Sequence, residues 1–156
     1  MKNIWKRLMK LSEEVADYLG IDLIPIEYEN LEIDDSRLVL KPIPKIVISI
    51  KYEDNFIESA KCITHEMRHI FQIYYVNLMN DKLARIWKEE LAQAKSSANI
   101  NVNSNEYNDY SLQAIELDAF AFSQFYLRRN NIFFKYENKE FQRLVEEYIK
   151  NYLYEN

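Results

Sequence analysis

The chain has 156 residues, of which 48% are hydrophobic, and a formal net charge of −5. This length and hydrophobic content exclude an intrinsically disordered chain and predict a single domain over residues 1–156. The negative charge gives no reason to expect a nucleic-acid partner, and no apolar run is long enough to predict a membrane-spanning helix.

The cysteine and glycine content narrows the function classes further. A single cysteine, Cys62, excludes an internal disulfide, and no segment is typical of a signal peptide, so we expect a cytoplasmic protein. A single glycine excludes phosphate-binding loops and dinucleotide-binding fingerprints, which need glycines at fixed offsets. Any chemistry must therefore come from side chains on helices and strands.

The first third of the chain predicts one helix followed by a small sheet. Apolar residues at helical spacing predict a helix over residues 3–19, and Gly20 follows where a helix-terminating glycine is expected. Strands are expected at residues 21–28, 37–41 and 46–52. We expect these strands to form a three-stranded antiparallel sheet. In the third strand, alternate residues should share one face: Ile46, Ile48, Ile50 and Tyr52.

The next helix, over residues 55–77, carries the most informative motif. Asn55 and Glu58 form a predicted capping box at its start. Its middle reads His65-Glu66-Met67-Arg68-His69, which is the HExxH pattern and contains both histidines of the chain. Two histidines four residues apart project from one face of a helix and can bind one zinc ion, and Glu66 can act as the general base.

Three helical segments are expected in the remainder of the chain. The first spans residues 81–95, with Leu83, Ile86, Trp87 and Leu91 directed inward. A loop rich in Ser and Asn follows at residues 96–109. A second helix, residues 111–129, is apolar on nearly every face, and an amphipathic helix over residues 141–153 ends the chain. Together these elements predict an α+β fold with a mainly helical remainder.

A catalytic zinc site usually has three protein ligands, and no third histidine remains for it. Glu116 and Asp118 lie inside the apolar helix, where an ionised carboxylate needs a partner or a metal. They point about 200° apart around a helix, so only one of them can face the ion. Glu116 is the first choice and Asp118 the second; the alternative is that the acid pairs with Arg68 or Lys61.

Four further residues are candidates for catalytic, hydrogen-bonding or ligand roles near the site. Tyr110 or Tyr107 is a candidate donor to a developing oxyanion, although the chain has many other tyrosines. Gln72 lies one turn beyond His69, where a hydrogen-bonding role within the fold is favoured over contact with a substrate. Cys62 is expected to be buried and inert instead of serving as a ligand.

The HExxH helix and the downstream segment Glu116-Leu117-Asp118-Ala119-Phe120 resemble the small gluzincin metallopeptidases, including the minigluzincins and the IrrE/ImmA-like and phage-encoded enzymes. The resemblance covers about residues 45–127. It implies a zincin-type active-site helix packed on the sheet, one Zn²⁺ bound by His65, His69 and Glu116, and Glu66 as the general base. The chain departs from many gluzincins at Phe120, where those proteins carry Asp or Asn.

The expected function is thus zinc-dependent hydrolysis of peptide bonds in a peptide or protein substrate. The alternative is a metal-binding regulatory or interaction protein with little or no peptidase activity. A closed structural zinc site is disfavoured because such sites prefer four Cys or His ligands, and this chain has too few. The sequence specifies neither the substrate nor the oligomeric state.

Overall fold

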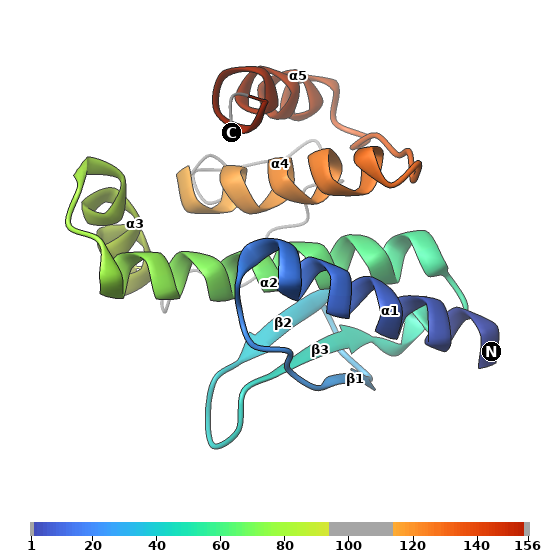
Figure 1. Ribbon diagram of the computed structural model, residues 1–156. Helices are drawn as coiled ribbons and strands as arrows, with labels where there is room; N and C mark the ends of the chain where they lie inside the picture. The colour runs from blue at the N-terminus through green and yellow to red at the C-terminus, as the bar shows by residue number, and fades with distance from the viewer. Residues whose placement is uncertain (1, 94–113, 155–156) are drawn as a thin grey trace. The chain divides into compact units, whose positions relative to one another are not determined.

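The computed structural model describes residues 2–93 and 114–154, which form five α-helices and a three-stranded sheet (Figure 1). The predicted α+β class is confirmed. The chain divides into two compact units, Met1–Phe71 and Gln72–Asn156. The first unit contains α1 (Lys2–Leu19), β1 (Ile26–Glu29), β2 (Ser36–Val39), β3 (Lys45–Ser49), the short 3₁₀ helix η1 (Ile50–Tyr52) and most of α2 (Phe56–Leu78).

The sheet is mixed, with strand order β1-β3-β2. β2 and β3 pair antiparallel, as expected, because the short connection over residues 40–44 returns the chain beside itself. β1 instead pairs parallel to β3, so the expected antiparallel arrangement is wrong for this pair. The chain crosses from β1 to the opposite edge and then returns through the centre, and the hydrophobic pattern of a strand does not encode that order.

The central strand β3 is buried on both faces. Ile46, Val47 and Ile48 are all fully buried, which is the pattern of a strand covered on both sides instead of on one. The strand ends at Ser49 and the chain turns into η1, so the expected single face continuing through Ile50 is interrupted. β1 begins only at Ile26, and the preceding Pro25 carbonyl accepts a hydrogen bond from the Ile46 amide at 2.9 Å.

Helix α1 ends at Gly20 as predicted. Gly20 has a φ of +66°, its amide donates to the Asp17 carbonyl, and the Ile21 amide donates to the Ala16 carbonyl. These two bonds form a Schellman motif, in which a left-handed residue after the helix satisfies the last carbonyls. α1 lies on the same side of the sheet as α2 (Figure 1).

Helix α2 begins with half of the predicted capping box. The Asn55 side chain accepts a hydrogen bond from the Glu58 amide at 3.1 Å. The reciprocal bond is replaced, because the Asn55 amide donates to the Tyr52 carbonyl and the Glu58 carboxylate binds Lys61 at 2.9 Å. The start of α2 is therefore fixed to η1 as well as to its own first turn.

The second unit is helical, with α3 (Lys82–Gln93), α4 (Ala114–Arg129), α5 (Lys139–Tyr148) and the π-helical turn η3 (Ile149–Leu153). Both α3 and α5 contact α4. Trp87 of α3 is buried as expected, but Leu83 and Ile86 are exposed, because the small Ala84 occupies the inward position. In the parts of the chain that the structure describes, no helix is long and apolar enough to cross a membrane.

α4 is buried around most of its circumference, as its apolar composition predicts. Its buried residues are Ile115, Glu116, Asp118, Ala119, Ala121, Phe122, Ser123, Gln124, Phe125, Tyr126 and Leu127. Two carboxylates therefore lie on a helix that gives them little access to water. Each of them needs a polar partner or an ion.

Candidate metal centre

His65 and His69 form the core of the candidate site. They lie one turn apart on α2, both half-buried, with their Nε2 atoms 3.1 Å from each other. The two rings meet edge to face at 85°. Two nitrogens bound to one tetrahedral zinc ion at about 2.0–2.1 Å would be about 3.3 Å apart. The histidine pair thus already has the separation that a shared ion requires.

Glu116 is the third member of the site. One ligand atom from each of His65, His69 and Glu116 lies within 4.8 Å of the others, so these residues are close enough to bind a metal ion. The Glu116 side chain comes from the first turn of α4 and is only 5% exposed. Two neutral imidazoles and one carboxylate are a donor set that suits zinc and other divalent first-row metals.

Asp118, the second choice for a ligand, is bound elsewhere. Its Oδ2 accepts a hydrogen bond from Gln72 Nε2 at 2.7 Å, and its Oδ1 accepts one from the Tyr148 hydroxyl at 2.9 Å. Gln72 Nε2 also donates to the Ile115 carbonyl at 2.8 Å. The Gln72 amide therefore holds α4 on both sides of Glu116, and the prediction of a role within the fold for Gln72 is confirmed.

The start of α4 is capped by a carboxylate from α3. Glu90 Oε1 accepts a hydrogen bond from the Ala114 amide at 3.0 Å, and Oε2 accepts one from the Ile115 amide at 2.7 Å. An acid at a helix N-terminus satisfies amides that have no partner within the helix and interacts favourably with its dipole. Glu90 and Gln72 together fix the turn that carries Glu116. No local signal in the sequence marks Glu90, because it caps a helix that begins 24 residues later.

Glu66 lies on a different face of α2 from the two histidines. Its side chain is 6% exposed, and its Oε1 accepts a hydrogen bond from the Ser36 hydroxyl at 2.7 Å. Within the described part of the chain, this is the one hydrogen bond made by the Glu66 carboxylate. Ser36 opens β2 and lies 30 residues away in sequence, so no motif could have revealed it.

Cys62 shares the Glu66 face, one turn earlier. Its thiol donates to the Asp35 carbonyl at 3.8 Å, and burial raises its pKa to about 12. A thiol this buried and this weakly acidic is a poor ligand and a poor nucleophile. The prediction of a buried cysteine is confirmed.

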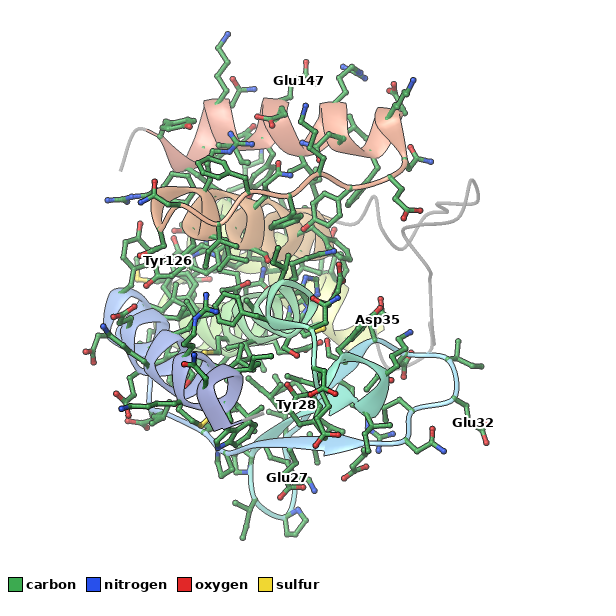
Figure 2. The ribbon with its side chains drawn as sticks, turned by 90° about the vertical axis from the view of Figure 1, so that its right-hand side faces the viewer. Glu27, Tyr28, Glu32, Asp35, Tyr126 and Glu147 are labelled. Carbon is green, nitrogen blue, oxygen red and sulfur yellow. The ribbon has the colours of Figure 1, made fainter. Side chains whose placement is uncertain are left out.

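Asp35 anchors the beginning of β2 to neighbouring elements. Its carboxylate accepts a hydrogen bond from the Tyr52 hydroxyl at 2.8 Å and pairs with Lys51 at 2.6 Å, while its carbonyl accepts the Ser49 amide at 2.8 Å. Burial, followed by the bond to Asp35, raises the pKa of Tyr52, which keeps its hydroxyl a donor. Figure 2 shows Asp35 and Glu32 on the segment that leads from β1 to β2.

The two bases of the salt-bridge alternative, Lys61 and Arg68, each have a contact within α2 itself. Lys61 binds Glu58 on its own helix, and the Arg68 guanidinium lies 4.4 Å from the centre of the Phe71 ring. Tyr110, the predicted oxyanion donor, and Tyr107 lie outside the described residues, as does the loop at 96–109.

Comparison of the chain with protein-family models, with curated proteins and with solved structures gave no match.

Proposed function

We propose that the protein is a zinc-dependent hydrolase that cleaves peptide bonds. One observation carries the proposal: His65, His69 and Glu116 lie close enough together to bind a metal ion, and Glu66 lies between the two histidines in the sequence of the same helix. In this proposal the three ligands hold one Zn²⁺ and Glu66 is the general base. The resemblance of the HExxH helix and the Glu116 segment to gluzincins supports the same assignment.

The choice of zinc and of hydrolysis depends on Glu66. Two histidines and one carboxylate also occur in iron oxygenases, where the metal itself activates oxygen. Such a site has no need of a buried carboxylate adjacent to its ligands and held by a hydroxyl. A hydrolase does need one, because a base must take a proton from water. The Ser36–Glu66 pair therefore favours hydrolysis.

In the proposed reaction, the metal ligands and Glu66 have separate roles. A bound zinc ion would act as a Lewis acid and lower the pKa of a water molecule toward ~7. Glu66 accepts one proton from the attacking water while the water oxygen forms a bond to the carbonyl carbon. The same proton then passes from Glu66 to the amide nitrogen as the C–N bond breaks. The products are a carboxylic acid and an amine, which become a carboxylate and an ammonium group when the remaining proton of the water passes to the amine, and no electrons are exchanged with another molecule.

The substrate in this proposal is a peptide or protein, and Tyr110 remains the predicted donor to the oxyanion. The cytoplasmic location likewise stays a prediction. The rival proposal is a regulatory or interaction protein that binds a metal but hydrolyses little. The two proposals differ in the role of Glu66, because a protein that only binds a metal would not need a general base.

Glu66→Gln separates the two proposals. The amide keeps the size of the side chain but cannot take a proton, so we expect zinc content to stay at one ion per chain while hydrolysis of fluorescein-labelled casein falls by about 10²–10⁴-fold. His65→Ala should lose the zinc as well. Retained zinc with equal casein hydrolysis in Glu66→Gln would contradict the hydrolase, and absence of zinc from the purified wild-type protein and from protein refolded with zinc would contradict both proposals.

A further inference from the structure

Ser36 stands out because, among the described residues, its hydroxyl is the hydrogen-bond partner of the proposed base and comes from outside α2. Its hydroxyl donates to Glu66 Oε1 over 2.7 Å, which is a well-formed hydrogen bond. Hydrogen bonds that a carboxylate accepts are roughly twice as strong as those between neutral groups. The bond also leaves the second carboxylate oxygen, Oε2, without a hydrogen bond among the described residues.

Ser36 is itself held rigidly. It is the first residue of β2 and pairs in register with Ile48 of the fully buried central strand. The residue before it, Asp35, is fixed through its carboxylate by Tyr52 and Lys51 and through its carbonyl by Ser49. The Ser36 backbone therefore has little freedom to move. Its side chain contacts Glu66 from a fixed point on the sheet.

A carboxylate on a long side chain needs such a contact to act as a base. Glu has three rotatable side-chain bonds, and a catalytic group must be held close to one geometry for efficient proton transfer. A single donor to Oε1 removes rotation about the last bond and directs Oε2 away from the serine. The helix alone cannot do this, because α2 fixes only the direction in which the side chain leaves the backbone.

We infer that Ser36 is a positioning residue for the proposed reaction: it fixes the Glu66 carboxylate through Oε1 so that Oε2 is the atom that accepts and returns the proton. The inference rests on the proposed hydrolase function. It extends the active site from the zinc helix to the start of β2. No metal ligand is involved in the bond.

The test compares Ser36→Ala, which removes the donor, with Ser36→Thr, which keeps a hydroxyl and suits a strand position. Ser59→Ala is the matched control, because Ser59 is a fully buried hydroxyl on α2 that bonds Tyr28 and the Tyr52 carbonyl instead of Glu66. Each variant is loaded with zinc, its metal content is measured, and its crystal structure is solved. Kinetic constants are then measured with fluorescein-labelled casein.

For Ser36→Ala we expect full zinc content, a rotated or disordered Glu66 carboxylate and a kcat about tenfold lower at unchanged KM. Ser36→Thr should restore both the carboxylate position and kcat, and Ser59→Ala should keep both. A Glu66 carboxylate that stays in place in Ser36→Ala, or an unchanged kcat, would overturn the inference. These results differ from failure of the proposed function, in which the wild type would not hydrolyse casein or Glu66→Gln would hydrolyse it equally well.

Discussion

Neighbouring residues of α2 have different environments because a helix turns by about 100° per residue. His65 and His69 share a face with each other and approach Glu116, whereas Glu66 and Cys62 face the start of β2. In the proposed function, the motif would separate metal binding from proton transfer within five consecutive positions. Cys62 lies one turn before Glu66, yet its buried thiol serves only the packing of the fold.

Cys62 gives a testable pH dependence. Burial raises the pKa of its thiol from 9.0 to about 12, so the folded protein holds this proton more tightly than the unfolded chain does. Its contribution to stability is complete below pH 9 and is lost as the pH rises toward 12. In urea unfolding between pH 7 and 11, the wild type should therefore lose stability more steeply than Cys62→Ala. Equal slopes would show that the folded thiol titrates normally.

The residue-level predictions from sequence succeeded where the evidence was local. The spacing of the HExxH motif predicted that His65 and His69 share one helix face, and the cost of burying an acid indicated Glu116 and Asp118 on α4 as candidates, with Glu116 as the first choice. Ser36 and Glu90 could not be found in this way. Each contacts a partner that is 24 or more residues away in the sequence. Neither the serine nor the glutamate lies in a local pattern that predicts such a contact.

At the scale of elements, α4 matters most because it carries Glu116, the proposed third ligand. Two unrelated contacts fix its first turn: the Glu90 cap on the Ala114 and Ile115 amides, and the Gln72 amide bound to Ile115 and Asp118. Helix boundaries and the fold class followed from periodicity. The parallel pairing of β1 with β3 could not be predicted in this way, because a run of apolar residues indicates that a strand is buried but does not indicate which strand lies beside it.

Gln72→Leu tests whether this clamp positions Glu116. The substitution leaves a buried carbonyl and a buried carboxylate oxygen without their donor, which should cost about 1–3 kcal/mol in urea unfolding. Zinc affinity should fall by about 10–100-fold, as is usual when residues that support a ligand are removed. Competition with a chromogenic chelator measures it.

Gln124→Leu is the control for this variant. Gln124 is buried on the same helix and donates to the Phe134 carbonyl and to Gln142. Its loss should destabilise the fold by a similar amount and leave zinc affinity unchanged. If both variants bind zinc as the wild type does, Gln72 serves only the packing of the helices.

At the scale of the whole molecule, metal binding and folding should be coupled. The unfolded chain cannot bring together residues 47 to 51 positions apart, so an ion bound by His65, His69 and Glu116 stabilises only the folded state. At a free zinc concentration 1,000 times the Kd this is worth about 4 kcal/mol. For a chain of this size that corresponds to a rise in Tm of about 10 °C.

Chelation tests the coupling. Excess EDTA should lower the Tm of the zinc-loaded protein by about 10 °C, and added zinc should restore it. His69→Ala should have the lower Tm with or without zinc, because one ligand is missing. A Tm that does not respond to zinc in the wild-type protein would mean that the three residues do not bind the ion in the folded state.

The enclosure of α2 has a consequence for how the chain tolerates change. From Glu58 to Ile73 every residue is at least partly buried, whereas α1 alternates between its buried stripe and exposed positions. A saturation mutagenesis library scored for folded protein should show a 3.6-residue rhythm of permissive sites along α1. Over residues 58–73 of α2 this periodicity should be absent, and consecutive positions should all be intolerant of substitution. Sequence drift in this protein would then concentrate outside residues 58–73 of α2 and outside α4, which is also buried around most of its circumference.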